Sequence, residues 1–375
     1  CYPCRSQRKV ARFKGWNYTH GTMVMPVIWM VDAYRAGERG QVRALADALS
    51  KELGWACETR VLEYRKPLFL PHLLGWDSVL GIAAESAASL QPPWPDLVLS
   101  CGVRNEPVCR WIRAQSGGRT RYIHVGRPWA ELDSFDLVVT TPQYRVPARP
   151  NVVNNLLTLH GLTAERLAQA REQWSQHFSA LPRPRFAVIT GGNSGPFTFG
   201  PRAATRLAAE TSRIARQRNG SLLVTTSSRT SPSAAEALQG AIDVPNYFYR
   251  WQPDDDANPY LGMLACADRL VVTGDSIAML SEACATGKPV QMFDLGGMNG
   301  PARYPRDFRL GGLLYAAMLR WLPQSLSRDI TLVHRQLRDA GRAKWLEEES
   351  GAAAMPGESD LQRAVAAVKR LLGEH

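Results

Sequence analysis

The residues best suited to chemistry lie in the stretch 271–290, VVTGDSIAMLSEACATGKPV. An apolar run of strand type leads into Gly-Asp-Ser, and a short helical pattern follows before Gly-Lys-Pro and the next apolar run. Gly274 permits a tight turn, while Asp275 or Ser276 can cap the helix and leave backbone N–H groups pointing outward. A phosphate or pyrophosphate could bind there; the alternative is that both side chains serve only as an N-cap.

The same helical pattern carries a polar pair, Ser281 and Glu282. Both lie more than one helical turn beyond Ser276, so they cannot belong to the cap. A glutamate at this depth could point toward a cleft and accept hydrogen bonds from the two hydroxyls of a ribose. Gly287 and Pro289 indicate where this short helix ends.

The elements that must position these residues alternate along the chain from Val24 onward, with short β-rich runs followed by helical patterns. A chain of 375 residues favours two domains, and the helical segment LTAERLAQAREQWSQHFSAL ends at PRPR, a natural boundary. The sequence therefore predicts an α/β protein with two doubly wound, Rossmann-like domains that face each other across a cleft. We expect residues 24–180 to form the first domain and residues 181–375 to form the second, including the closing C-terminal helices.

Ligands of such sheets bind outside the carboxyl ends of the strands. In the second half, the loops at those ends are TGGNSGPFTFG, TTSSRTSP and TGDSIAML, and all three are rich in Gly, Ser and Thr. We expect these loops to form an anion-binding edge.

Residues 1–23 form a basic stretch that contains no acid. Its five basic residues reduce the net charge of +11 to 11 − 5 = +6 when the stretch is set aside. It has no apolar h-region, so we expect no secretory signal. We expect it to be upstream sequence before a start at Met23 or Met25 and not part of the fold; the alternative is an organellar transit segment.

Other site classes lack their usual patterns. The remaining basic residues are scattered among acids without a nucleic-acid-binding motif, so we expect no nucleic-acid partner. Seven widely spread Cys favour a reducing compartment over a disulfide framework. Cys1 and Cys4 have no second ligand pair, and the run Asp254–Asp256 precedes a helix entry, so we expect no metal site. No apolar run is long enough to span a membrane.

The order strand, Gly-x-x-x, Ser-Glu-Ala, Gly-Lys-Pro-Val resembles the donor-binding segment of GT-B glycosyltransferases and of nucleotide-sugar 2-epimerases. More closely, ANPYLGMLACADRLVVTGDSIAMLSEACATGKPV, together with ITGGNSGPFTF and TTSSRTSP, resembles the mitochondrial-fission Elm family. Bacterial members of that family are often labelled as nucleoside-diphosphate-sugar enzymes. The resemblance covers residues 25–330 and is strongest in the second half.

The resemblance implies that Gly274, Asp275 and Ser276 face a nucleotide diphosphate and that Glu282 contacts the ribose. It also implies that the loop after the first strand of the second domain approaches the phosphates closely and that Arg229 supplies a fork for phosphate oxygens; the alternative for Arg229 is a solvated loop arginine. The nucleotide-binding candidates are Gly191, Gly192, Asn193, Ser194, Thr226, Ser228, Arg229, Gly274, Asp275, Ser276, Ser281 and Glu282.

The first domain holds the candidates for the acceptor side. The segment RAGERGQVRAL fits the family pattern, although many bacterial relatives have His at the position of Glu38. Asp32 and Glu38 are candidate bases, with loop or capping carboxylates as the alternative. Ser100 lies in a second strand-end loop that faces the same cleft. The acceptor-side candidates are Arg35, Gly37, Gln41, Gly102 and Arg104.

The sequence thus favours a metal-independent glycosyltransferase that needs no cofactor, uses a nucleoside-diphosphate sugar and is cytoplasmic. Two alternatives stay open: an epimerase or hydrolase of the same fold, and a non-catalytic scaffold, because plant members are linked to recruiting the fission dynamin. A basic surface and the Trp-bearing stretch LLYAAMLRWLPQSLSR also suggest a peripheral contact with the inner membrane surface, where a lipid-linked acceptor would lie. The alternative for this stretch is an ordinary buried helix.

Overall fold

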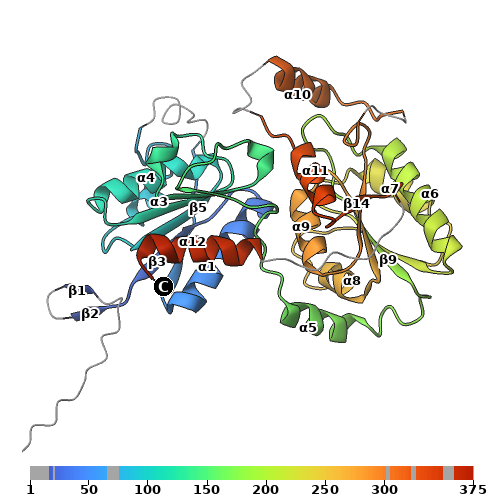
Figure 1. The fold of residues 1–375 in the computed structure, drawn as a ribbon, viewed down its shortest axis with the longest axis horizontal. Coiled ribbons are helices and arrows are strands. Elements are labelled where there is room, and N and C mark those ends of the chain that lie inside the picture. Colours follow the sequence, from blue (N-terminus) through green and yellow to red (C-terminus); the bar gives the residue numbers. More distant parts are fainter. Residues whose placement is uncertain are drawn as a thin grey trace, which may run out of the picture.

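The computed structural model describes residues 17–19, 22–65, 76–300, 305–321, 327–348 and 359–374. Two six-stranded sheets form the centres of two domains that lie side by side (Figure 1). The strands pair in parallel throughout both sheets, in the orders β4-β3-β5-β6-β7-β8 and β11-β10-β9-β12-β13-β14. The predicted fold class, two doubly wound α/β domains, is confirmed.

The first sheet comprises β3 (Val27–Val31), β4 (Ala56–Arg60), β5 (Leu97–Cys101), β6 (Arg121–Val125), β7 (Leu137–Thr140) and β8 (Val152–Asn154). Its helices are α1 (Ala36–Leu53), α3 (Ala84–Ala88) and α4 (Glu106–Gln115), with 3-10 turns at Val103–Asn105, Leu132–Ser134 and Pro142–Tyr144. Every residue of β5 is buried. Helices cover both faces of a parallel sheet, so a central strand of this kind is apolar on both sides rather than alternating.

The second sheet comprises β9 (Arg185–Ile189), β10 (Ser221–Thr225), β11 (Asn246–Tyr249), β12 (Arg269–Thr273), β13 (Val290–Phe293) and β14 (Lys344–Trp345). Its helices are α5 (Ala164–Trp174), α6 (Pro201–Gln217), α7 (Pro232–Gly240), α8 (Tyr260–Cys266), α9 (Ile277–Ala285), α10 (Leu310–Trp321) and α11 (Thr331–Asp339). One large apolar core surrounds this sheet. Both sheets reverse their strand order at their first strand, between β3 and β5 and between β9 and β12.

Two helices cross the predicted boundary near residue 180. Helix α5 packs on α8 of the second domain, where a Cβ at Gly262 would lie 2.2 Å from Cγ of Trp174. The last helix, α12 (Asp360–Leu372), packs instead on α1 of the first domain and buries Ala364 and Val368 in that core (Figure 1). This differs from the expected grouping of the closing helices with the second domain. Helical periodicity indicates that one face is buried, but not against which sheet.

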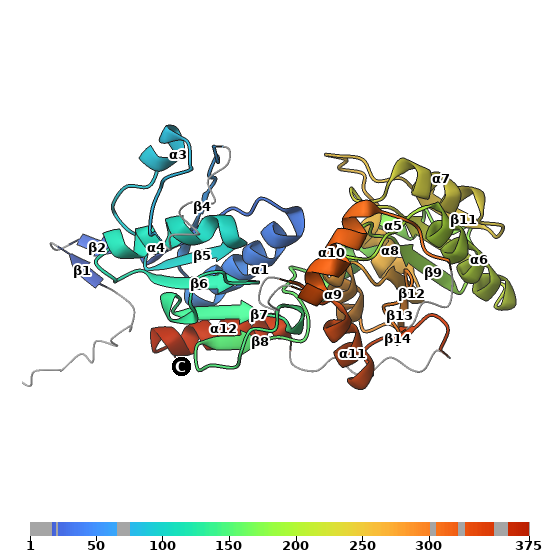
Figure 2. The same ribbon diagram turned by 90° about the horizontal axis from the view of Figure 1, so that it is seen from above.

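Helix α12 is hydrogen-bonded to the segment that connects the two domains. The carboxylate of Asp360, in the first turn of α12, accepts the backbone N–H groups of Leu156 and Leu157 at 3.1 and 3.0 Å. Figure 2 shows α12 on the side of the first sheet that α1 also covers. The C-terminal helix therefore fixes the segment that leads from the first domain into the second.

The N-terminal stretch contains a short hairpin of β1 (Asn17–Thr19) and β2 (Thr22–Val24), apart from the two large sheets. The other predictions for residues 1–23 lie outside the described residues, as do Cys1 and Cys4. No helix in the described part of the chain has the length and apolar character needed to cross a membrane. The five Cys residues described in the structure are free thiols.

Candidate functional site

The candidate loops of the second domain meet at its switch point. Strand β9 lies between β10 and β12, so the loops that follow these three strands are neighbours at one edge of the sheet. They are TGGNSGPFTFG after β9, TTSSRTSP after β10 and TGDS after β12. The structure thus brings together the three segments that the sequence singled out.

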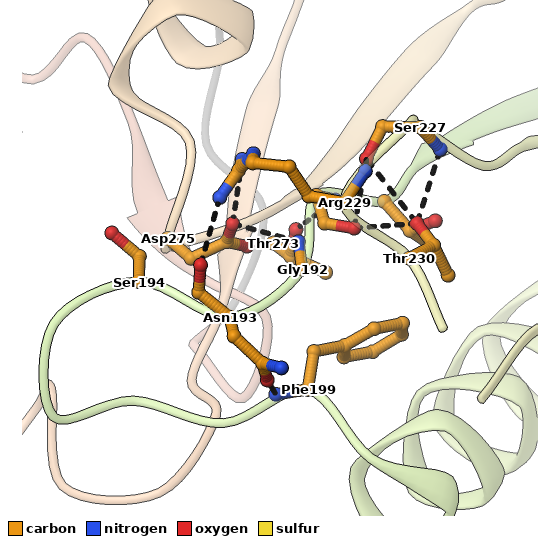
Figure 3. A network of polar contacts seen from close by, with 12 residues as sticks. Gly192, Asn193, Ser194, Phe199, Ser227, Arg229, Thr230, Thr273 and Asp275 are labelled. Carbon is orange, nitrogen blue, oxygen red and sulfur yellow. Dashed lines mark hydrogen bonds and ion pairs between the residues drawn. The ribbon is translucent and has the colours of Figure 1, made fainter. Parts of the chain in front are cut away.

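Asp275 lies at the centre of this cluster (Figure 3). Its side chain is buried, and its Oδ2 accepts the backbone N–H of Gly192 at 2.8 Å and contacts the guanidinium of Arg229 at 2.8 Å. Arg229 also donates to the carbonyl oxygen of Asn193 at 3.3 Å. Oδ1 of Asp275 is buried without a hydrogen-bond partner among the described residues. The carboxylate therefore links the turn after β12 to both other loops.

Two glycines make this contact possible. A Cβ at Gly191 would lie 2.2 Å from Oδ2 of Asp275, and one at Gly192 would lie 2.1 Å from the carbonyl oxygen of Arg229. Both distances are far below van der Waals contact, and the second involves a backbone atom that cannot rotate away. The Gly-Gly pair is thus required by close packing of loop on loop.

Two hydroxyl groups hold the Gly-Gly turn from the other side. Ser227 and Thr230 both donate to the carbonyl oxygen of Gly191, at 2.9 and 2.5 Å (Figure 3). The sequence instead pointed to Ser228, whose side chain is exposed, and to Thr226, whose Oγ1 accepts the N–H of Trp251 at 2.8 Å inside the protein. No sequence signal distinguishes the two serines, because Thr226 and Ser227 are both buried and the turn begins at Ser228.

The turn after β12 directs the N-terminus of α9 to the same edge. Ser276 occupies the N-cap position without a side-chain cap, and Asp275 is engaged elsewhere, so the alternative of a simple N-cap does not hold. The N–H groups of the first helical turn have no acceptor within the helix, and the helix dipole makes this end favourable for an anion. A Cβ at Gly274 would lie 2.7 Å from Sδ of Met298.

His334, on α11, forms a hydrogen bond to the turn after β12. Its Nε2 donates to the carbonyl oxygen of Gly274 at 2.7 Å, with Nε2 carrying the proton because a carbonyl can only accept. The side chain is buried, and burial lowers its pKa to about 4. The imidazole is thus neutral at physiological pH and acts as a fixed hydrogen-bond donor.

Ser281 and Glu282 have different surroundings. Ser281 is buried, donates to the carbonyl oxygen of Ile277 at 2.8 Å and accepts the N–H of Thr158 at 3.0 Å, so it anchors the segment between the domains. The carboxylate of Glu282 accepts the hydroxyl of Tyr260, at the start of α8. Burial raises the pKa of Glu282, and the Tyr260 hydroxyl opposes that rise. Of the polar pair, only Glu282 is partly exposed.

In the first domain the loops after β3 and β5 meet in the same way. Glu38, in the first turn of α1, lies against the loop after β5: a Cβ at Gly102 would lie 2.7 Å from its Oε2. Burial raises the pKa of Glu38, with Arg35, Arg328 and Arg104 acting in the opposite direction. Glu38 is thus the candidate base with a raised pKa at the switch point of the first sheet.

The other first-domain candidates are mostly occupied or exposed. The carboxylate of Asp32 accepts the N–H of Ala33 at 3.0 Å and the guanidinium N–H of Arg39 at 2.8 Å, which matches the loop-carboxylate alternative. Arg104 lies over the ring of Tyr34. The remaining candidates are placed as follows: Arg35 and Gly37 are exposed, Gln41 bonds to the carbonyl of Gly37 and lines a small cavity together with residues of β6, β7 and the segment 155–159, and Ser100 is buried against Tyr122.

Arg328, which lies in no recognisable sequence pattern, joins the two halves of the site. Its guanidinium donates to Oγ of Ser194 in the loop after β9. In the first domain, burial raises the pKa of the Tyr144 hydroxyl, and the Arg328 charge opposes that rise. The same charge also reaches Glu38. The next residue, Asp329, forms an ion pair of 2.6 Å with Arg145 of the first domain. The surrounding sequence, SRDI, carries no motif, so only the tertiary structure identifies this arginine.

No group of three or more His, Cys, Asp or Glu side chains is arranged to hold a metal ion in the described ranges. The run Asp254–Asp256 lies before α8, where Asp255 accepts the hydroxyl of Tyr249 and the N–H of Ala257. These carboxylates are therefore part of a helix-entry loop.

A family model covers most of this chain. The family model described as "Mitochondrial fission ELM1" matches residues 36–371. Mitochondrial fission protein ELM1 of Arabidopsis thaliana is 27% identical over 234 residues, which are 56% of this chain and 54% of the plant protein. Uncharacterized protein RP120 of Rickettsia prowazekii (strain Madrid E) is 22% identical over 299 residues, which are 71% of this chain and 82% of that protein.

Among solved structures, the S. aureus MnaA-UDP co-structure is similar with a TM-score of 0.45 and 13% sequence identity. The superposition covers 93% of this chain and 97% of that chain. The fold assignment itself rests on the two parallel sheets described above.

Proposed function

The chain belongs to the mitochondrial fission ELM1 family, and we propose that it is a metal-independent glycosyltransferase. In this proposal the second domain binds a nucleoside-diphosphate sugar and the first domain presents the acceptor. The observation that carries it is the convergence of three glycine- and hydroxyl-rich loops on the N-terminus of α9, at the switch point of a doubly wound sheet.

The diphosphate would lie at the N-terminus of α9. Backbone N–H groups of the first turn and the guanidinium of Arg229, whose side chain is 40% exposed, are the donors available for its oxygens. When the bond between the sugar and the diphosphate breaks, negative charge grows on the leaving oxygen, and preorganised donors stabilise that charge most effectively. Arg328, bonded to Ser194 in the adjacent loop, adds a second positive charge.

Glu282 would hold the ribose. The Tyr260 hydroxyl fixes its carboxylate, and a carboxylate has further lone pairs that can accept ribose hydroxyls. Ser281 takes no part, because its hydroxyl is committed to Ile277 and Thr158.

Glu38 would act as the base if the reaction inverts configuration. The acceptor oxygen attacks the anomeric carbon, its proton passes to the Glu38 carboxylate, and the nucleoside diphosphate leaves with the bonding electrons. Burial raises the pKa of Glu38, which brings a carboxylate closer to the range of an efficient general base. Asp32 is the weaker candidate because Arg39 and the Ala33 N–H already occupy it.

The proposed reaction takes place in the cytoplasm, on an acceptor at a membrane surface. The free thiols of the described cysteines suit a reducing compartment, and we place the protein in the cytoplasm. The acceptor would be carried by a membrane lipid, reached by peripheral contact. No nucleic acid takes part.

A thermal-shift panel tests the donor site. UDP, GDP, ADP, CMP and TDP, each with its sugars, would be compared on wild type, on Glu282→Ala and on the control Glu236→Ala, an exposed glutamate of α7. We expect one base to raise Tm in wild type and in the control, and Glu282→Ala to lose most of that shift. An equal shift in all three proteins would sink the assignment of Glu282.

One observation favours a second candidate, the non-catalytic scaffold. Arg229, the most accessible cation of the loop cluster, is already paired with Asp275, as it would be in an idle site. No thermal shift with any nucleotide would support this reading. Conversion of the bound sugar nucleotide in the absence of any acceptor would instead favour an epimerase or hydrolase.

A further inference from the structure

Helix α10 carries a strongly exposed apolar surface. Among its side chains, Leu310, Leu313, Leu314 and Trp321 are 64%, 56%, 60% and 79% exposed, and Phe308, just before the helix, is 78% exposed. Within the helix only Gly312 is buried. The alternative of an ordinary buried helix is therefore wrong. Figure 1 shows α10 at the edge of the second domain, set apart from the sheet.

The exposed apolar side chains lie on one face of the helix. Leu310, Leu313, Leu314, Met318 and Trp321 follow the spacing i, i+3, i+4, i+8, i+11, which places them on one stripe of a helix with 3.6 residues per turn. We call this stripe the α10 apolar face. Apolar stripes of globular proteins normally face the core, whereas this one faces outward.

The opposite side of α10 is the one attached to the protein. A Cβ at Gly312 would lie 3.1 Å from the carbonyl oxygen of Pro196, and one at Gly195 would lie 3.1 Å from the ring of Tyr315. The Tyr315 hydroxyl accepts the backbone N–H of Arg328 at 3.1 Å. These contacts seat the helix on the loop after β9, so the apolar face is presented to whatever lies outside.

The charged residues of the α10 segment are arginines. The segment FRLGGLLYAAMLRWLPQSLSR, residues 308–328, contains three arginines and no Asp or Glu; Arg309 bonds to the carbonyl oxygen of Gly195 and Arg328 to Ser194, which leaves Arg320 as the exposed one. The nearest preceding acid, Asp307, is turned toward the protein, where its carboxylate accepts the N–H groups of Gly200, Arg202 and Ala203. Arg320 and the terminal Trp321 are exposed. Arginine and tryptophan beside an apolar stripe are the composition of helices that lie in an anionic membrane interface.

We propose that α10 is an interfacial helix that buries its apolar face in the surface of an anionic lipid bilayer. A second copy of the chain fits less well: two such faces packed together in a symmetric pair would bring Arg320 of each copy into the contact without supplying an anion. A bilayer supplies both the apolar phase and the negative charge.

The membrane contact does not depend on what the loop cluster binds. Its consequence for catalysis does rest on the proposed function: because α10 sits on the loop after β9, a membrane-bound α10 would hold the donor site beside the lipid surface. A lipid-linked acceptor could then reach it without leaving the bilayer.

Vesicle flotation of the full chain tests the proposal. The probes are phosphatidylcholine vesicles with and without phosphatidylglycerol, and the proteins are wild type, Leu314→Glu and Leu80→Glu. Leu80 lies in the first domain and is 60% exposed, as Leu314 is, so the two substitutions are matched in type and exposure. We expect wild type and Leu80→Glu to float with the anionic vesicles and Leu314→Glu to bind them about tenfold more weakly.

A charge variant tests whether binding depends on attraction between Arg320 and anionic lipid. Arg320→Gln should weaken binding to anionic vesicles about fivefold, and added salt should have the same direction of effect on wild type. The Tm of each variant should equal that of wild type, because both side chains are exposed, and this measurement excludes misfolding as the cause. Quenching of tryptophan fluorescence by brominated lipid, smaller in Trp321→Phe, would place the end of α10 in the interface.

Three results would overturn the proposal. Wild type could remain unbound at every lipid composition, or Leu314→Glu and Leu80→Glu could bind equally well. Light scattering after size exclusion could also show a dimer that Leu314→Glu converts to a monomer without any vesicle binding, which would assign the face to a second copy. Nucleotide thermal shifts are measured without lipid, so failure of the proposed function and failure of the membrane contact can be told apart.

Discussion

The guanidinium of Arg229 lies 2.8 Å from the buried carboxylate of Asp275, an ion pair that joins the loop after β10 to the turn after β12. The same carboxylate oxygen accepts the N–H of Gly192. Asp275 thus takes its partners from both other loops of the candidate site, and the shape of the site depends on it.

Arg229→Ala should destabilise the protein more than an ordinary surface substitution does. Among the described residues it leaves the buried Asp275 carboxylate with the Gly192 N–H as its donor, and an under-satisfied buried charge costs about 1–3 kcal/mol. Urea unfolding at neutral pH measures the difference. Arg213→Ala, at an exposed position of α6, is the control and should stay within about 0.5 kcal/mol of wild type. Equal stability of the two variants would mean that the ion pair contributes little.

Gly192→Ala should disrupt the loop cluster, because its Cβ would lie 2.1 Å from the carbonyl oxygen of Arg229. Overpacking of this kind costs about 1–3 kcal/mol. Gly40→Ala, in α1, adds a methyl group where nothing lies within 4 Å and should stabilise the protein by about 0.5–1 kcal/mol. Thermal unfolding of both variants checks the opposite signs; a Gly192→Ala protein as stable as wild type would contradict the close loop contact.

His334 should make stability depend on pH below about 6.5. Burial lowers its pKa to about 4 from 6.5, so between these values the unfolded chain binds a proton that the native state does not. Native stability is therefore fully present above pH 6.5 and falls with decreasing pH down to about 4, by roughly 1 kcal/mol per pH unit. The free energy of unfolding of His334→Gln should fall less over this window, and that of exposed His177→Gln should follow wild type. Parallel profiles for all three would refute the assignment.

Glu38→Gln should lower kcat about 10²–10⁴-fold, while Asp32→Asn should have a smaller effect. The physical reason is that burial raises the pKa of Glu38, whereas the carboxylate of Asp32 is already bonded to Arg39 and Ala33. The rate of wild type should rise with pH through the raised pKa of Glu38, since the base must be deprotonated. Transfer assays and nucleotide thermal shifts on the same samples separate chemistry from donor binding. An unchanged kcat in Glu38→Gln would leave the reaction without this base.

The family, the fold class and the meeting of three loops could be predicted from the sequence, and the structure or the comparisons confirm each of them. Side-chain roles were harder. Ser227 and Ser228 are neighbours of the same type, and only the direction of the backbone decides that Ser227 binds the carbonyl of Gly191 while Ser228 is exposed. Ser281 and Glu282 are also neighbours, and the direction of the backbone decides that Ser281 bonds to Thr158 whereas Glu282 accepts the hydroxyl of Tyr260.

The alternation of strands and helices and the positions of the glycine-rich turns follow from the sequence alone, because they depend on local periodicity and on backbone freedom at single residues. Three features depend on tertiary packing: α12 joins the first domain, Arg328 bonds to Ser194 while the next residue, Asp329, pairs with Arg145 of the first domain, and the apolar face of α10 points outward. These are contacts between residues far apart in the chain. An apolar stripe or a long cationic side chain is compatible with many partners, and the choice among them is made by the packing of the whole molecule.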